Sequence, residues 1–303
     1  MTFKKENYYT TVERAKDLIP GFREAYAHFE ERVVLDQCSK SLLTNYGRNV
    51  CHLALHFMRL PHEVSVDEIN TYLYRQSVHE GHSASYFKQT VFGMKYWFRA
   101  FGMEDKAIRL PLIKKEKKLP VVLSKEECKK LFAAPRLLKH RFLLAFAYSG
   151  GLRMNELRHM RISDIDLDRN QVRIKQGKGK KDRYVILSRF ISDRLPKYLN
   201  EVKPQVYLFE GQTSGMVMGE RSIQYIIKEA LQKTDILKEV SMHTLRHSYA
   251  THLLEDGVDI YTIQHLLGHS HLSTTIIYLH VAQVIPKVGK SPLDSLYGFK
   301  DIK

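Results

Sequence analysis

The spacing of the apolar residues constrains the fold of this 303-residue chain more than any other feature. Over most of its length, apolar side chains recur every three or four residues, which is the spacing of one face of an α-helix. At 171–175 and 183–187 the spacing changes to two, and apolar and polar residues alternate as in half-buried strands. A glycine-containing turn at 177–182 joins these runs and predicts a β-hairpin. The sequence therefore predicts a mainly helical α+β protein with a small β-sheet.

The first 110 residues carry four amphipathic helical patterns and are expected to form a small all-helical bundle. Ser65, with Glu68 three residues later, fits the start of the third helix, and Ser83 fits the start of the fourth. Trp97 lies in the fourth helix, near Phe92, Tyr96 and Phe98. We expect these aromatic residues to form the core of the bundle rather than a platform on which bases stack.

The length of the chain exceeds the size at which one hydrophobic core usually keeps growing, so two domains are expected. A charge-rich stretch lies between Pro111 and Pro120. Because prolines bound it on both sides, it is not expected to continue a helix of either domain. Ser124 then offers the cap of a new helix. The expected organisation is a helical domain at 1–110, a linker at 111–120, a second domain at 121–290 and a tail at 291–303.

The charge of the chain favours a polyanionic partner. There are 48 Lys and Arg against 33 Asp and Glu, which gives a formal net charge of +15. Nucleic acid is the commonest such partner, because each neutralised phosphate releases condensed counterions. An anionic membrane surface is the competing interpretation. The sequence shows neither an apolar run long enough to span a bilayer nor the apolar stretch of a secretory signal, so we expect a cytoplasmic protein without a membrane partner.

Neither a disulfide framework nor a metal site is indicated. The three cysteines are widely spaced and lack a Cys-x-x-Cys pairing, so we expect buried, reduced thiols. They are Cys38, Cys51 and Cys128. Three histidines of the first half have no metal-ligand companions at convincing spacing. These are His62, His79 and His82. We therefore expect no metal and no other cofactor.

Four short stretches of the second half combine into a specific pattern. They are Ser-Gly-Gly-Leu-Arg-Met-Asn-Glu-Leu at 149–157, the basic turn at Lys178, His-Thr-Leu-Arg-His at 243–247, and the segment 266–278 that contains Gly-His and ends in Tyr278. Taken singly, each has an ordinary structural explanation, such as an ion pair between Arg153 and Glu156, a solvated turn or a tyrosine in the core. Their order, their spacing and the basic composition together favour a shared catalytic role.

This order and spacing resemble the catalytic half of the tyrosine recombinases, the phage-integrase type of enzyme that includes Xer resolvases, lambda-type integrases and integron integrases. The resemblance covers 121–290 strongly, and the helical first half more weakly as the SAM-like core-binding domain of that family. It implies an enzyme without cofactors or a small-molecule substrate that breaks and rejoins double-stranded DNA through a covalent 3′-phosphotyrosine. The catalytic residues that it implies are Arg153, Lys178, His243, Arg246, His269 and Tyr278.

The chemistry of these side chains fits the implied roles. Two guanidiniums supply permanent charge and bidentate donors to the non-bridging oxygens of a phosphodiester, while a tyrosine phenolate serves as nucleophile and as leaving group. We expect Lys178 to protonate the departing 5′ oxygen, with Lys180 and Lys181 as alternatives. His243 is expected to act as a general base or a hydrogen-bond partner near the tyrosine, and His269 to hold the phosphate.

The resemblance also implies a homotetramer on two paired DNA sites, in which the C-terminal segment of one subunit docks on its neighbour, and a monomer without DNA. Residues 281–303 could form that segment, because Leu293, Leu296 and Tyr297 make a short apolar set, although packing in cis is equally open. The segment after Tyr278 is similar to the end of integron integrases. The run 187–242 is too short for the extra helix of those enzymes, so integron-like and Xer-like enzymes both stay open, in integration, excision or resolution.

Two other functions stay open at this point. A type IB topoisomerase would use similar side chains to relax DNA, although the compact helical first half argues against it. A non-catalytic, basic DNA-binding accessory protein is the other alternative, and the complete set of six residues argues against that. The motifs do not specify the DNA target site or the accessory proteins, because base recognition depends on which side chains meet which groove.

Overall fold

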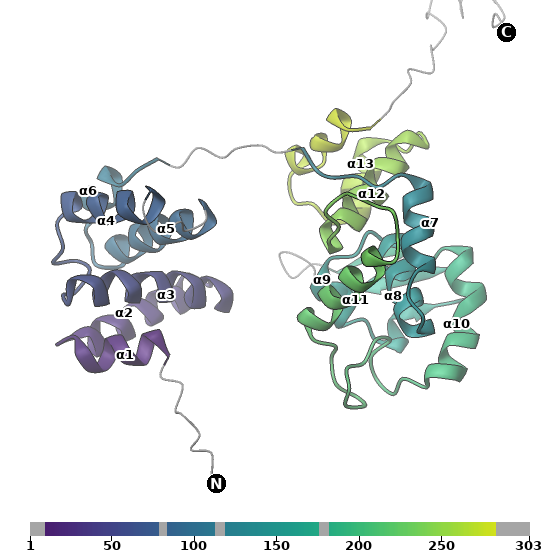
Figure 1. Cartoon of the computed structure of the whole chain (residues 1–303), viewed down its shortest axis with the longest axis horizontal. Helices are drawn as coiled ribbons and strands as arrows, with labels where there is room; N and C mark the ends of the chain where they lie inside the picture. The colour runs from purple at the N-terminus through teal and green to yellow at the C-terminus, as the bar shows by residue number, and fades with distance from the viewer. Residues whose placement is uncertain (1–9, 79–83, 113–118, 176–181, 283–303) are drawn as a thin grey trace, which may run out of the picture. The chain divides into compact units, whose positions relative to one another are not determined.

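The computed structural model describes residues 10–78, 84–112, 119–175 and 182–282 (Figure 1). The chain divides into two compact units, 1–116 and 117–303. The described elements confirm the expected fold class, since they are mostly helical with one small antiparallel sheet. No described helix combines the length and the apolar character that crossing a membrane requires.

The first unit is a bundle of helices around one core. Its described helices are α1 (Thr11–Leu18), α2 (Phe22–Leu35), α3 (Lys40–Phe57), α4 (Val66–Val78), α5 (Ala84–Ala100) and α6 (Glu104–Arg109). Trp97 of α5 is completely buried and stacks on Phe22 of α2, with 5.9 Å between ring centroids. Its core position confirms the prediction from the sequence, although the nearby Phe92 is 38% exposed.

Two of the predicted helix starts are confirmed by reciprocal side-chain caps. At α4, Ser65 Oγ accepts the backbone N–H of Glu68 (3.2 Å), and the Glu68 carboxylate accepts the backbone N–H of Ser65 (2.9 Å). Ser124 and Glu127 form the same arrangement at the start of α7 (Lys125–Ala133). Each cap satisfies amide donors that have no partner within the helix. The predicted start at Ser83 lies outside the described residues.

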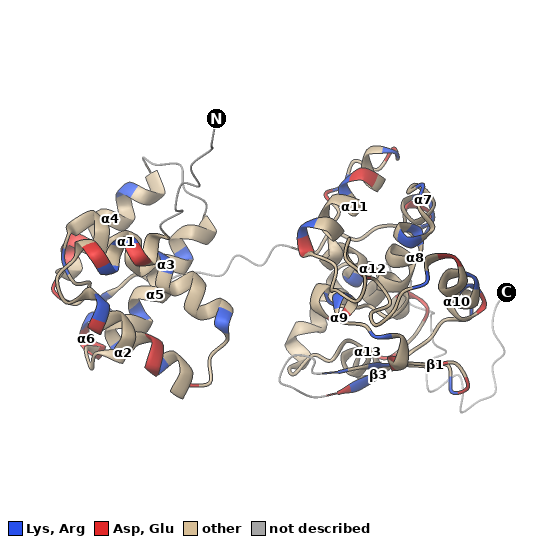
Figure 2. Ribbon diagram, turned by 90° about the horizontal axis from the view of Figure 1, so that it is seen from below, with Lys and Arg blue, Asp and Glu red and all other residues tan. Residues whose placement is uncertain are grey.

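The second unit is built around the apolar helix α8 (Leu138–Ser149), which packs against α7, α10 and α12. Its other helices are α9 (Met154–Arg158), α10 (Arg189–Val202), α11 (Glu220–Gln232), α12 (Met242–Glu255) and α13 (Ile260–Leu267), with the 3-10 turns η1 (Ile162–Asp164), η2 (Leu272–Thr274) and η3 (Ile276–His280). Lys and Arg positions are distributed over the helices of both units (Figure 2).

The sheet of the second unit consists of β1 (Ile165–Asp166), β2 (Gln171–Ile174) and β3 (Arg183–Ile186), in that order and antiparallel. Strands β2 and β3 confirm the two predicted runs. The two-residue β1 was not predicted, because it is too short to show a period of two. In β3, Arg183 and Val185 are buried, whereas Tyr184 and Ile186 are 53% and 61% exposed. An arginine therefore points into the unit at the start of β3. The turn predicted at 177–182 lies mostly outside the described residues.

The three cysteines are free thiols. Cys51 and Cys128 are buried, as the sequence predicted, but Cys38 is only half-buried. The difference arises because Cys38 lies in the short connection between α2 and α3, outside the helical bundle's core positions. Among the described residues, no group of three His, Cys, Asp or Glu side chains is placed to hold a metal ion.

Phe29→Ala should destabilise the first unit by about 3–5 kcal/mol, because this fully buried ring packs against Tyr26 and Trp97. Trp97 is the single tryptophan of the chain, so its fluorescence during urea unfolding reports on this unit. Phe146→Ala in the core of the second unit is the matched control and should leave the midpoint of that fluorescence transition unchanged. Equal shifts in both variants would contradict two separately folded cores.

Candidate active site

Helix α12 carries two of the predicted catalytic residues in its first turns. Ser241 caps the helix, since its Oγ accepts the backbone N–H of Thr244 at 3.3 Å. His243 is exposed in the first turn, and Arg246, one turn later, is only 3% exposed. His247 shares a face with His243 because the two are four residues apart, and their ring centroids lie 6.3 Å from each other.

The guanidinium of Arg246 is held by backbone carbonyls from two other segments. Its Nη1 donates to Gly151 O and its Nη2 to Leu267 O, both at 2.6 Å. Gly151 has a φ of +56°, and a Cβ there would lie 2.4 Å from the ring of Tyr249. Glycine is therefore required at 151, in the motif that the sequence places directly before Arg153.

Arg153 and Glu156 form a compact pair at the start of α9. Glu156 Oε2 accepts the backbone N–H of Arg153, and Oε1 accepts its Nη1–H, both at 2.8 Å. The Nη2 of Arg153 donates to the carbonyl of Gly268 at 2.9 Å. This ion pair, which alone would have an ordinary structural explanation, is here part of a buried network.

Arg183 completes this network from β3. It bonds both oxygens of Glu156 in bidentate geometry, at 2.7 and 2.8 Å, and both side chains are 6% exposed. Its Nε donates to Leu266 O at 2.9 Å. Arg246 Nη1 lies 4.0 Å from Glu156 Oε2. One carboxylate thus holds three guanidiniums, and we call Arg153, Arg183, Arg246 and Glu156 the arginine cluster.

The charges of the arginine cluster do not balance. Burial opposes the ionisation of Glu156, but hydrogen bonds and charge from Arg183 and Arg153 lower its pKa to about 2. Burial, followed by repulsion from Arg153, lowers the pKa of Arg246 to about 10, so it stays protonated at neutral pH. Three cations against one anion leave a net charge of +2 in the cluster. The cluster is therefore suited to bind an additional anion such as a phosphate.

Tyr278 lies in η3 beside this cluster and is 1% exposed. Its hydroxyl is 3.1 Å from His247 Nδ1, and its ring stacks on His269, with 6.4 Å between centroids. Burial raises the pKa of Tyr278, whereas the positive charges of Arg246 and Arg153 act in the opposite direction. The phenol is thus protonated at rest and close to cations that would stabilise its phenolate.

The two histidines nearest to Tyr278 are neutral at physiological pH. Burial and the nearby Arg246 and Arg153 lower the pKa of His269 to about 3. Burial, His243 and Arg246 lower the pKa of His247 to about 4. His269 Nδ1 is also 2.9 Å from the hydroxyl of Thr275, which fixes the orientation of its ring.

The structure brings together four of the six residues that the resemblance implies, namely Arg153, Arg246, His269 and Tyr278. His243 is exposed, and its ring lies against that of His247. Lys178 lies outside the described residues, as do Lys180 and Lys181.

Sequence reasoning missed two residues of the site. His247 could have been found from its position four residues after His243, which puts both on one helix face. Arg183 carried no comparable signal, because an arginine at the start of a strand after a basic turn looks solvated. For Glu156 the sequence offers only an ion pair with Arg153, and the structure shows it bonded to both Arg153 and Arg183.

Glu156→Gln should destabilise the second unit by about 3–5 kcal/mol near pH 7, because it leaves buried guanidiniums without their counterion. The wild-type carboxyl has a pKa of about 2, below its ordinary value of 4.5, so its stabilisation is complete above about pH 4.5 and is lost as the pH falls toward 2. Urea unfolding followed by circular dichroism at several pH values measures both effects.

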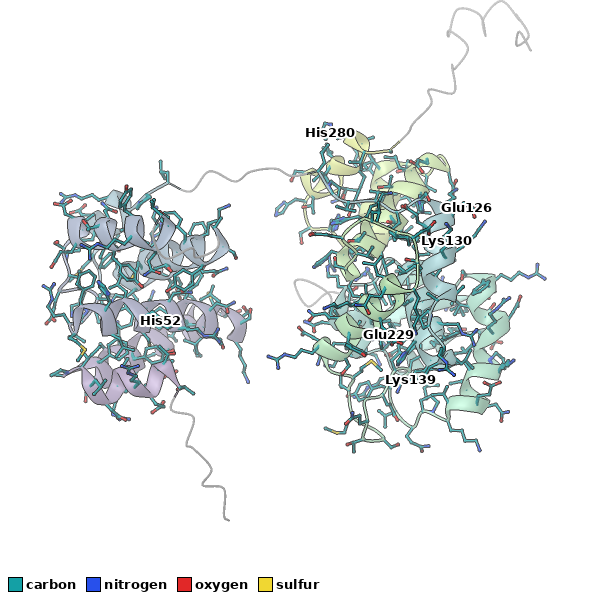
Figure 3. The ribbon with its side chains drawn as sticks, viewed as in Figure 1. His52, Glu126, Lys130, Lys139, Glu229 and His280 are labelled. Atoms are coloured by element: carbon teal, nitrogen blue, oxygen red, sulfur yellow. The ribbon has the colours of Figure 1, made fainter. Side chains whose placement is uncertain are left out.

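The matched control for this variant is Glu229→Gln on α11, a more exposed carboxylate paired with Lys233 (Figure 3). It should change the stability little, because exposed ion pairs contribute little. A Glu156→Gln variant as stable as this control, or a difference between the two that does not shrink below pH 4.5, would contradict the role of Glu156 as the counterion.

Comparison with known proteins indicates the family of the chain. Residues 121–284 match the phage integrase family. A protein of Sinorhizobium fredii described as an integrase/recombinase is 34% identical over 254 residues, which are 83% of this chain and 82% of that protein. Tyrosine recombinase XerA of Thermococcus kodakarensis is 37% identical over 206 residues, which are 66% of this chain and 72% of XerA.

Solved structures share the fold. A crystal structure of XerA recombinase is 27% identical, with a TM-score of 0.50, and the match covers 91% of this chain and 97% of that one. XerH bound to a palindromic difH substrate has a TM-score of 0.64 at 20% identity and covers 96% and 93%. A lambda integrase tetramer bound to a Holliday junction has a TM-score of 0.68 at 17% identity and covers 86% and 80%.

The family match extends over more than half of the chain. The alignments with these two relatives, each more than 30% identical to the chain, cover most of the length of each relative. The chain therefore belongs to the phage integrase family and is a tyrosine recombinase, an enzyme of site-specific DNA recombination.

Proposed function

We propose that this recombinase cleaves a strand of double-stranded DNA by attack of the Tyr278 hydroxyl on a phosphodiester, which forms a 3′-phosphotyrosine and releases a 5′ hydroxyl. The observation that carries the proposal is the position of Tyr278, whose hydroxyl lies 3.1 Å from His247 and whose ring stacks on His269. His247 directly follows Arg246 in the chain, and His269 directly follows Gly268, whose carbonyl accepts a hydrogen bond from Arg153. Attack of a 5′ hydroxyl on the phosphotyrosine rejoins the strand, so the number of bonds is conserved and no energy source is required. Relatives described as recombinases give no support to a topoisomerase or a non-catalytic accessory protein.

In this proposal the arginine cluster binds the reacting phosphate. A guanidinium carries five N–H donors, and the bonds from Arg153 and Arg246 to carbonyls and to Glu156 fix both groups in place before DNA arrives. Donors fixed in this way stabilise the charge that develops on the phosphate oxygens without reorganisation. His269, oriented by Thr275, is proposed to bond the same phosphate through its other ring nitrogen.

Lys178 is the proposed general acid for the departing 5′ oxygen. It lies outside the described residues, but β3 begins shortly after it at Arg183, which is bonded into the arginine cluster. His243, exposed at the start of α12, is proposed as a hydrogen-bond partner of the phosphate or the tyrosine.

The proposed substrate is double-stranded DNA. The net charge of +15 provides long-range attraction to phosphates, and the lambda integrase and XerH structures of similar fold are bound to DNA. We propose that the enzyme acts in DNA integration, excision or resolution. The proposed compartment is the cytoplasm. The units 1–116 and 117–303 are proposed as the core-binding domain and the catalytic domain.

We further propose a homotetramer on two paired DNA sites. The second unit contains a cavity of about 850 Å³ between α7, α8, α10 and α12, with an apolar wall that includes Phe132, Ala145 and Ile191. Basic residues border it, namely Lys129, Arg141, Arg194 and Lys197. Such a cavity suits a short apolar segment with an acidic residue. The segment 293–297 of a neighbouring subunit, Leu-Asp-Ser-Leu-Tyr, has this character and is the proposed occupant.

The covalent step is tested on DNA fragments that the protein selects from its source genome. These fragments are remade as duplexes with a nick close to the cleavage position. The short strand released by cleavage then diffuses away, and the covalent complex accumulates. Wild-type protein should accumulate an adduct that survives SDS, and Tyr278→Phe should form none. Tyr198→Phe is the control, because it removes a phenol that is equally buried but bonded to Leu208 O. An adduct formed by Tyr278→Phe would refute Tyr278 as the nucleophile.

Removal of residues 291–303 should leave covalent cleavage of a single site intact but prevent the joining of two DNA duplexes into one complex. Ala145→Phe, which fills the cavity from α8, should have the same effect. The truncated chain keeps an open cavity, and the Ala145→Phe variant keeps its tail. Mixing the two variants should therefore restore part of the assembly. Sedimentation of the DNA complexes measures this, and full assembly by the truncated chain would show that the tail does not join the subunits.

A further inference from the structure

We infer that His247 is a catalytic residue of this enzyme, the general base that takes the proton of the Tyr278 hydroxyl. This inference rests on the proposed function, since it assigns a role within the attack by Tyr278. The residue-level resemblance names His243 for such a role, whereas the structure places a different histidine at the phenol.

The first argument is contact. His247 Nδ1 is 3.1 Å from Tyr278 Oη, within the distance at which a proton is transferred directly. Their ring centroids are 5.7 Å apart, and contacts between α12 and η3 hold the two side chains together. His243 is exposed one turn earlier, and its ring lies 6.3 Å from that of His247. Of these two histidines, His247 is the one in contact with the nucleophile.

The second argument is the charge of the surroundings. The titratable and charged groups around His247 are His243 and Arg246 on α12, Tyr278 on η3 and His269 after α13, with Arg153 and Arg183 next to Arg246. Burial, followed by His243 and Arg246, lowers the pKa of His247 and keeps its imidazole neutral at physiological pH. A neutral imidazole has a lone pair for the phenol proton, and the buried phenol, which is reluctant to ionise by itself, requires such an acceptor.

The third argument explains how DNA would switch on the base. In the free protein, a proton on His247 would face the uncompensated positive charge of the arginine cluster. A phosphate bound by Arg153 and Arg246 adds negative charge there, which favours the imidazolium. His247 therefore becomes a strong enough base only when DNA is bound. Without DNA, Tyr278 is not activated.

The proton balance is complete. The O–H bond of Tyr278 breaks and its proton forms the Nδ1–H bond of His247, while the phenolate oxygen forms the bond to phosphorus. The bond from phosphorus to the 5′ oxygen breaks, and that oxygen receives a proton from the proposed acid Lys178. In the rejoining step, His247 returns its proton to the departing phenolate, and the attacking 5′ hydroxyl gives its proton back to Lys178.

The test measures single-turnover adduct formation on a saturating nicked duplex. His247→Asn keeps a hydrogen-bonding atom near the position of Nδ1 but takes up no proton, so we expect adduct formation to be slower by about a hundredfold or more near neutral pH. The deficit should shrink as the pH rises, because the phenolate then forms without a base. His247→Ala should be slow too, and added imidazole should raise its rate by about tenfold.

The matched control is His140→Asn. His140 is a half-buried histidine of the same unit whose pKa is also lowered, chiefly by burial. Its neighbour Lys139 and the last residue of η3, His280, lie toward opposite ends of the unit (Figure 3). His140→Asn should form the adduct at the wild-type rate, and circular dichroism checks that all variants are folded.

The possible results separate the inference from the proposed function. If the wild-type protein forms no adduct, both are wrong. If the wild type reacts but His247→Asn reacts as fast or faster, His247 only holds the resting tyrosine and the inference alone is wrong. Slow variants that neither high pH nor imidazole restores would also overturn it, because they would indicate a structural role.

Discussion

The site depends on one buried carboxylate. Glu156 bonds Arg183 in bidentate geometry and Arg153 through both its backbone and its side chain. These bonds link three segments that are far apart in the sequence, the start of α9, the start of β3 and the end of α13, where Leu266 and Gly268 accept bonds from the same arginines. Without this anion, the guanidiniums would repel one another in a buried place. The same interaction therefore fixes both the local fold and the position of the cations.

The incomplete neutralisation of the arginine cluster connects the fold to the chemistry. A single carboxylate among three arginines leaves the site positive, and the protein tolerates this because backbone carbonyls of Gly151 and Leu267 share the charge of Arg246. A phosphodiester carries one negative charge and would offset one of the two excess positive charges. The other remains to stabilise the negative charge that develops on the phosphate oxygens during attack. The positive charges that hold the histidines neutral would be partly offset when a phosphate binds. In our proposal, recognition of DNA and activation of the tyrosine are therefore coupled electrostatically.

Much of the fold followed from local patterns. The change of apolar spacing located β2 and β3, and the capping residues located the starts of α4 and α7, because caps and periodicity are properties of neighbouring residues. Other features depend on contacts across the fold and leave no such signal. The inward face of β3 begins with Arg183, whereas the alternation of polarity alone would place an arginine outward. Its burial is explained by its partners Glu156, 27 residues away, and the carbonyl of Leu266, 83 residues away.

The central claim is that Tyr278 becomes covalently joined to DNA. Because the chain has 17 tyrosines, the test must identify which of them carries the DNA. The most direct measurement is to form the adduct on a nicked duplex, digest both the protein and the DNA, and identify by mass spectrometry the residue that carries the remaining nucleotide. The account predicts a nucleotide joined through its 3′ phosphate to Tyr278. A nucleotide on any other residue, or one joined through its 5′ phosphate, would contradict it.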